Sequence, residues 1–151
     1  RVRHTYQLMH PRAADGNARG GGRSGFNRCT YTRQLPCSPR GSALALDLAI
    51  VVNGWRVSTF ELRNNCTKQT VEDAVQQYKR DRDPRELIFG FGRCMAHFAL
   101  DDQRVKFFTH LQGKAAWFMP FDPAATDGAA NPPNPTAVQT DYLDRRLLAP
   151  T

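Results

Sequence analysis

The sequence predicts an α/β domain built on a mixed β-sheet, and three observations support this prediction. Residues 43–52 and 55–62 are strand-like runs separated by Asn53-Gly54, the dipeptide most typical of a two-residue hairpin turn. One strongly amphipathic helix is predicted from Thr70, and further strand-like segments follow it. A hairpin, a crossover helix and a returning strand indicate a sheet with both antiparallel and parallel pairs.

The strands before the hairpin and the two ends of the helix are predicted from local sequence signals. Weak strands are expected at residues 6–9 and 30–35, before the hairpin. Thr70 can cap the helix, with Asp73 as its capping-box partner, and Pro84 requires the helix to end by residue 83. The apolar side chains of this helix recur on one face: Val71, Ala74, Val75 and Tyr78.

The segments after the helix are shorter and apolar. Strands are predicted at residues 87–91, 95–100 and 105–111, with a further one at 117–121. Residues 127–135 contain Gly128 and three prolines, which predicts a stiff loop. A last short helix is predicted at residues 142–148.

The positive charge of the chain lies at one end. The chain has 151 residues and a formal net charge of +7, and residues 1–40 hold eight arginines against one aspartate, which accounts for the whole excess. We therefore predict a basic, glycine-rich arm over residues 1–28 and one domain over 29–151. Such an arm suits phosphate binding, or it is a flexible segment without a specific partner. Because the chain begins with Arg1, we expect it to be a fragment of a longer polypeptide.

Composition excludes several classes of protein. No apolar run approaches the ~18–20 residues of a membrane span, so no membrane association is expected. The four cysteines form no C-x-x-C pair, which disfavours a disulfide scaffold and favours the reducing cytoplasm. Cys94 and His97 offer only half of a zinc site, and His97 is interpreted as a core histidine.

Two strand carboxylates are the best candidates for chemistry. Asp47 is the one charged residue in its strand, and Glu61 lies fourteen residues later. A two-residue turn would place Asp47 opposite Phe60, with Glu61 on the other face. A three-residue turn would pair Asp47 with Thr59 and bring Glu61 onto the same face, about 7–8 Å away diagonally. The turn therefore decides whether the two carboxylates meet.

In the second register, the pair suits a hard cation. Asp47, Glu61 and the carbonyl of Leu62 would bind Mg²⁺ or Mn²⁺, with Arg63 orienting water or binding phosphate. A cation there would support phosphodiester hydrolysis. The alternative is a paired or solvated carboxylate at the edge of a sheet.

Four segments in order give the chain a family resemblance. The segments LDLAIVVNGWRVSTFELRNN, TVEDAVQQYKRDRDPRELIF, RCMAHFALDD and PFDPAATDGAANPPNP resemble the N-terminal nuclease domain of the restriction (motor) subunit of type I restriction–modification enzymes. Asp47 followed by Glu61-Leu62-Arg63 is similar to the core motif of the PD-(D/E)XK nuclease superfamily. The resemblance spans residues 27–142, most of the chain.

The resemblance implies a restriction-endonuclease-like core and a Mg²⁺-dependent endonuclease acting on double-stranded DNA. It also implies a complex with methylation and specificity subunits, and ATP-driven lobes in the full-length subunit. This chain has no G-x-x-x-x-G-K-[ST] loop, so ATP is not expected to bind it. The rival interpretations are a non-catalytic DNA-binding domain and a subunit-docking domain derived from such a nuclease.

Site residues carry over one by one. Asp47 and Glu61 stand at the ligand positions, whereas Arg63 stands where the family has lysine, which predicts weakened activity. The family's Gln-x-x-x-Tyr motif is absent, but Gln77 can substitute as a residue that orients a metal ligand or contacts DNA. Tyr78 is predicted either to share that role or to pack in the core, and the core is favoured. The cations at the helix end are expected to pair locally with neighbouring acids: Lys79, Arg80, Arg82 and Arg85.

Overall fold

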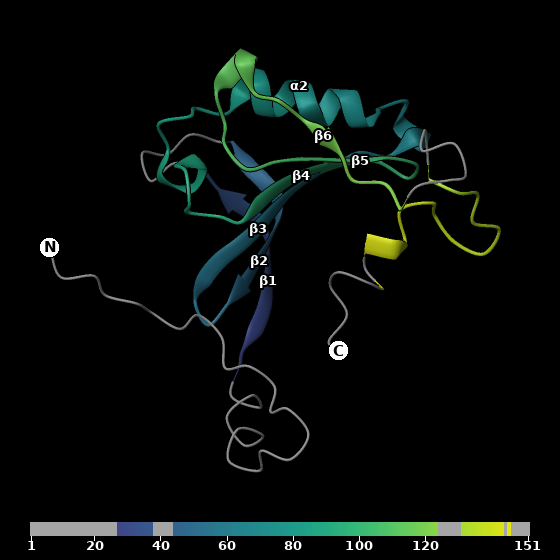
Figure 1. Ribbon diagram of the computed structural model, residues 1–151, viewed down its shortest axis with the longest axis horizontal. Helices are drawn as coiled ribbons and strands as arrows, with labels where there is room; N and C mark the ends of the chain where they lie inside the picture. The colour runs from purple at the N-terminus through teal and green to yellow at the C-terminus, as the bar shows by residue number, and fades with distance from the viewer. Residues whose placement is uncertain (1–26, 38–43, 124–130, 144, 146–151) are drawn as a thin grey trace, which may run out of the picture.

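Six strands form one mixed sheet in the order of the sequence. The computed structural model describes residues 27–37, 44–123, 131–143 and 145. Its strands run side by side, and one α-helix in the described ranges lies across one face of the sheet (Figure 1). The elements are β1 (Cys29–Pro36), β2 (Ala45–Val52), β3 (Trp55–Leu62), η1 (Asn65–Thr67), α2 (Val71–Asp81), η2 (Leu87–Phe89), β4 (Ala96–Leu100), β5 (Val105–Phe108), η3 (Gly113–Ala115) and β6 (Met119–Pro120).

The pairing confirms the predicted α/β class. The β1–β2–β3 and β4–β5–β6 neighbours are antiparallel, while β3 and β4 are parallel and are joined through α2. A parallel pair needs a long crossover connection, which α2 supplies. The hairpin and the crossover helix therefore lie where the sequence predicts them, on either side of β3.

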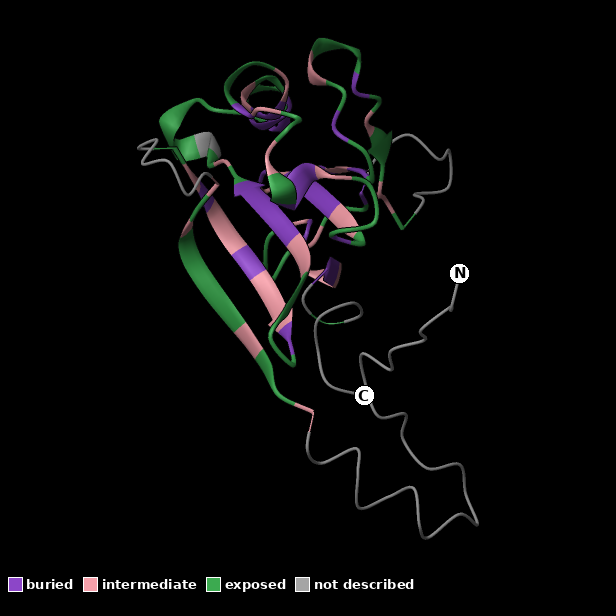
Figure 2. Cartoon of the chain, turned by 90° about the vertical axis from the view of Figure 1, so that its left-hand side faces the viewer, coloured by how far each residue is buried: buried purple, intermediate pink, exposed green. Residues whose placement is uncertain are grey.

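Helix α2 begins as the sequence predicts. The backbone N–H of Thr70 donates to the Asp73 carboxylate at 2.7 Å, and this bond holds the pKa of Asp73 below its usual range. The four predicted apolar residues are all buried, and they pack against sheet residues that include Leu46 and Phe108. Figure 2 shows this division, with the buried residues on the sheet and the inner side of the helix while β1 is exposed along most of its length.

The other face of the sheet carries a smaller core. Phe60 stacks on Phe98, with ring centroids 5.1 Å apart, and Leu143 packs into the same cluster. The stack joins β3 to β4 at the parallel pair, and Phe121 adds an edge contact to Phe98. β3 is therefore covered on both faces near its carboxyl end.

Some element predictions are corrected by the structure. Residues 87–91 do not form a strand: Leu87–Phe89 is the 3₁₀ helix η2, whose Ile88 and Phe89 are buried. The apolar run there reflects burial in a connection, because a run that short has the same composition in either conformation. The later strands are shorter than predicted, with β5 ending at Phe108 and β6 two residues long.

Other predictions fall outside the described residues. These include residues 1–26 of the predicted arm with its strand at 6–9, residues 127–130 of the loop at 127–135, and most of the helix at 142–148. No helix within the described ranges is long and apolar enough to cross a bilayer.

Candidate active site

The two carboxylates are brought together by a bulge as well as by the turn. Val52 pairs with Trp55 across a two-residue turn, in which Asn53 and Gly54 have φ values of 51° and 86°. Both residues lie in the left-handed region, as a primed hairpin turn requires. The register then shifts by one residue between Ile50 and Val51. The turn is therefore of the two-residue type. Beyond the bulge, however, each residue of β2 pairs one position further along β3 than this turn alone predicts.

This shift corrects both predicted registers. Leu48 pairs with Phe60 and Ala49 with Thr59, so neither Phe60 nor Thr59 is the partner of Asp47. The pairs of β2 and β3 end there, and Asp47 lies one residue before Leu48, where its Oδ2 accepts a hydrogen bond from the backbone N–H of Leu62. The charge of Asp47 also acts on the carboxyl group of Glu61, so the two carboxylates lie near each other at the carboxyl end of β3.

Asp47 contacts the end of β3 through one oxygen. Its Oδ2 accepts a hydrogen bond from the backbone N–H of Leu62 at 2.8 Å and lies 3.4 Å from Nη1 of Arg63. The side chain of Asp47 keeps a quarter of its surface exposed, whereas Glu61 is fully buried. Asp47 is therefore the carboxylate that solvent and solutes can reach.

Arg63 lies between two of the predicted metal ligands. Its Nη1 donates to the carbonyl of Leu62 at 2.7 Å and approaches Asp47, while its buried Nε has no hydrogen-bond partner in the part of the chain that the structure describes. The backbone N–H of Arg63 donates to the carbonyl of Leu100 on β4, which fixes where the side chain starts. A guanidinium thus neutralises the oxygens that a cation would otherwise share.

Glu61 forms a buried ion pair with Arg82 at the end of α2. Nε of Arg82 donates to Oε1 of Glu61 at 3.0 Å, and Nη2 donates to the same oxygen and to the carbonyl of Ala45 at 2.7 Å. Both side chains are completely excluded from solvent. Among the described residues, Oε2 of Glu61 and Nη1 of Arg82 have no hydrogen-bond partner. The pair therefore neutralises Glu61 but leaves one of its oxygens unsatisfied.

Burial dominates the ionisation of Glu61. Desolvation raises the pKa of Glu61 to about 7, although the nearby Arg82 guanidinium opposes that shift. The negative charge of Asp47 adds to the increase, and Arg63 acts against it. A carboxyl with this pKa is ionised only in part at neutral pH, and a bound cation would favour its charged form.

The structure corrects the role expected of Arg82. Arg85 pairs locally with Asp83, as predicted for the helix-end cations, and this contact lowers the pKa of Asp83 to about 2. Arg82 instead turns inward to Glu61. Its position carries a signal that helical spacing could have revealed, because residue 82 lies four residues after Tyr78 on the buried stripe.

The remaining predicted residues divide between core and site. Tyr78 is buried, with its hydroxyl 3.1 Å from Oγ1 of Thr59, which lies 2.7 Å from Nδ1 of His97. Burial lowers the pKa of His97 to about 4, so this histidine is neutral near pH 7. Tyr78 and His97 are therefore core residues, as predicted. Gln77 is half-buried and its Oε1 has no partner, whereas Gln76 is exposed.

The described residues contain no group of three or more His, Cys, Asp or Glu side chains placed to hold a metal ion. Cys94 and His97 are accordingly not part of such a cluster. Any ion at the site would rely on Asp47, Glu61 and the Leu62 carbonyl, completed by water or a substrate oxygen.

The fold and the site define an α/β domain with paired acids on adjacent strands, each contacted by an arginine. Residues 10–116 match the family model described as type I restriction enzyme R protein N terminus. The chain belongs to this family. No curated protein and no solved structure matches the chain.

Proposed function

We propose that this chain is the Mg²⁺-dependent endonuclease domain of a type I restriction enzyme R subunit, with a restriction-endonuclease-like core. Its substrate would be double-stranded DNA, hydrolysed at phosphodiester bonds. The observation that carries the proposal is the proximity of Asp47 and Glu61 at the carboxyl end of β3 in a member of this family. Paired carboxylates supply the hard oxygens that Mg²⁺ prefers.

The residues present fit a hard divalent ion. Oε2 of Glu61 is buried without a hydrogen-bond donor, which is costly for a carboxylate oxygen and is relieved by a cation. Asp47 is partly exposed beside it, and the Leu62 carbonyl lies within reach of the same guanidinium as Asp47. Mg²⁺, or Mn²⁺ in its place, would therefore be held by these three groups once Arg63 moves off the carbonyl.

Each residue of the site would have a separate role in hydrolysis. Bound Mg²⁺ would lower the pKa of a water molecule and polarise a phosphoryl oxygen. Asp47 and Glu61 hold the site's negative charge, and Arg82 fixes Glu61 through Oε1. A guanidinium group is a poor proton-transfer group, so Arg63 would bind the phosphate. Oε1 of Gln77 has no partner among the described residues, and we propose that this residue of α2 orients a metal ligand or contacts DNA.

The wider assembly is part of the same proposal. We propose that the chain works in the cytoplasm with methylation and specificity subunits, and its membership in the R subunit family supports this proposal. ATP would bind only the full-length subunit, since this chain has no phosphate-binding loop of the G-x-x-x-x-G-K-[ST] type.

One observation favours a second candidate, a non-catalytic DNA-binding or subunit-docking domain derived from such a nuclease. Both carboxylates already have an arginine partner, so the cluster of Asp47, Glu61, Arg63 and Arg82 is neutral when every member is ionised. A neutral cluster attracts a cation less strongly than a bare acidic pair does.

Cleavage of supercoiled plasmid DNA tests the proposal. We expect nicking that requires Mg²⁺ or Mn²⁺, and a loss of at least about 100-fold in Asp47→Ala because a metal ligand is removed. Glu72→Gln is the matched control, since Glu72 is an exposed acid on α2 that pairs with Lys106. Cleavage by Asp47→Ala at the rate of the unaltered chain would contradict the proposal.

Restoring the family's lysine tests the role of Arg63. We expect Arg63→Lys to raise cleavage on the order of tenfold, because an ammonium can give up a proton and leaves the Leu62 carbonyl free. If neither chain cleaves DNA but both bind it with a steep dependence on salt, the non-catalytic candidate is the correct one.

A further inference from the structure

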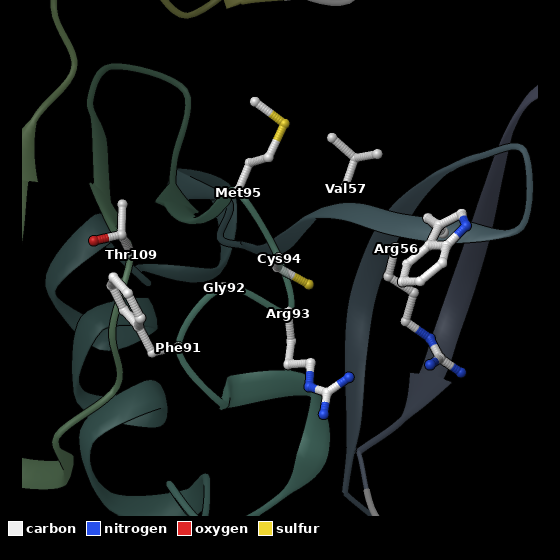
Figure 3. A pocket seen from close by; sticks show the side chains of 9 residues that line it. Arg56, Val57, Phe91, Gly92, Arg93, Cys94, Met95 and Thr109 are labelled. Carbon is white, nitrogen blue, oxygen red and sulfur yellow. The ribbon is translucent and has the colours of Figure 1, made fainter. Parts of the chain in front are cut away.

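A hollow lies at the hairpin end of β3, away from the carboxylates. It encloses about 440 Å³ and is formed by the start of β3, the loop that precedes β4 and Thr109 (Figure 3). Glu61 lies six positions beyond Trp55 along the extended strand, which is about 20 Å at 3.3 Å per residue. A ligand in the hollow would therefore not touch the acid pair.

The rim of the hollow exposes large apolar side chains. Trp55 is 58% exposed, Met95 is 69% exposed and Phe91 is 78% exposed. Phe91 also makes an edge contact with the ring of His110, at 5.6 Å between centroids. Several exposed apolar groups around one concavity indicate a surface that another molecule covers.

The charges of the hollow have one sign. Arg56 and Arg93 are its charged lining residues, and Figure 3 shows their guanidinium groups on the same side of the Cys94 thiol. Within the described part of the chain, neither arginine forms an ion pair with a carboxylate, unlike Arg63 and Arg82. Burial raises the pKa of Cys94 to about 11, so the thiol stays neutral and adds no negative charge. The hollow therefore favours an anionic ligand.

Aromatic faces beside arginines suit one anionic ligand in particular. Single-stranded nucleic acid offers unpaired bases that stack on aromatic rings and phosphates that bind guanidinium groups. A DNA duplex keeps its bases stacked inside, and a free phosphate has no group for the exposed aromatic rings. An acidic peptide would satisfy the arginines but not the aromatic faces.

We infer that this hollow binds single-stranded DNA, with a base stacked on Trp55 or Phe91 and its phosphates held by Arg56 and Arg93. The inference goes beyond the proposed nuclease function, because the hollow and the carboxylates are at opposite ends of β3 and can bind independently. It assigns single-stranded DNA to the hairpin end of the sheet and duplex DNA to the carboxylate end.

The two tryptophans of the chain allow a local measurement. Trp117 is 80% exposed and lies outside the lining, so Trp117→Phe leaves Trp55 as the one tryptophan reporter in the hollow. This local reporter is needed because the arginines of residues 1–40 can bind phosphate elsewhere. The probe is an oligothymidylate of about eight nucleotides, within the range of a single-strand site. Titration in EDTA and in the Asp47→Ala background separates the result from any cleavage.

We expect oligothymidylate to quench Trp55 and leave Trp117 unquenched in the reciprocal Trp55→Phe variant. Phe91→Ala should weaken binding by about 5-fold to 150-fold, the range for loss of one base stack. Arg56→Gln with Arg93→Gln should reduce the slope of log affinity against log salt by about 1.4. Arg33→Gln with Arg80→Gln removes the same charge from exposed sites outside the hollow, and we expect a smaller change in slope. Circular dichroism should show that every variant is folded.

Three results would overturn the inference. The first is an unquenched Trp55 at saturating oligothymidylate, and the second is equal affinity for a blunt duplex. The third is quenching by an oligoglutamate peptide with equal affinity, which would assign the hollow to an acidic protein segment.

Discussion

The two ends of β3 use the same residue type in opposite ways. At the carboxyl end, Arg63 and Arg82 donate to Asp47 and Glu61 in a largely buried cluster. At the hairpin end, Arg56 and Arg93 line an open hollow beside exposed aromatic rings. The difference shows that the position of a guanidinium, rather than its presence, decides whether it stabilises the fold or is available to a ligand.

Removal of Arg82 should give the largest effect. We expect Arg82→Met to lower the free energy of unfolding by about 3–5 kcal/mol, because it leaves the Glu61 carboxylate buried without its partner. Urea denaturation measures this loss, and Arg80→Met on the exposed side of α2 is the matched control. Arg82→Met combined with Glu61→Gln should recover part of the loss. A loss below about 1 kcal/mol would remove the contrast between the two ends of β3.

Protonation of His97 should have the next largest effect, and it acts against folding, whereas the raised pKa of Glu61 acts in the opposite direction. Burial lowers the pKa of His97 from 6.5 to about 4, so the folded state binds this proton less readily than the unfolded state. The contribution of neutral His97 to the free energy of unfolding is complete above pH 6.5. It is lost as the pH falls toward 4, by up to about 3 kcal/mol. Urea unfolding across this range measures it. His97→Gln should lack this acid-sensitive component, and an unchanged pH dependence in that variant would contradict the assignment.

The turn itself should have an intermediate effect. Gly54 has a φ of 86°, a conformation that costs a residue with a Cβ atom about 1–2 kcal/mol. We expect Gly54→Ala to lower the free energy of unfolding by that amount, although nothing lies within 4 Å of the added carbon. Urea denaturation checks this value, and an unchanged stability would show that the hairpin end can relax without strain.

The exposed side chains of the hollow should matter least for stability. We expect Arg56→Ala and Trp55→Ala to change the free energy of unfolding by no more than about 0.5 kcal/mol, because both residues are exposed. The same denaturation curves provide the comparison with Arg82→Met. A larger loss would mean that the hairpin end is also part of the folded core.

The elements with strong local signals were predictable from the sequence. Asn53-Gly54 placed the hairpin, and the spacing of Val71, Val75 and Tyr78 placed the buried face of α2. Residues 87–91 were predicted wrongly because an apolar run of that length does not distinguish a strand from a buried connection.

The site was predictable in its residues but not in its geometry. The lone acids in apolar strands pointed to Asp47 and Glu61, but a bulge has no strong sequence signal, so the register could not be derived. The partner of Glu61 was missed because Arg82 lies 21 residues away in the sequence, among charged residues that suggest local pairing. Only tertiary packing brings that guanidinium against β3.

Because of the bulge between Ile50 and Val51, the position of the acids does not depend strictly on the number of residues in the hairpin. One extra residue is absorbed there, so the pairs beyond it keep their alignment. A hairpin shorter by that residue, with an uninterrupted ladder, would keep the same pairs on the acid side and place the two acids thirteen instead of fourteen residues apart. Loss of that one residue near the turn would therefore leave the position of the acids unchanged. A sequence search for such sites should accordingly accept both spacings.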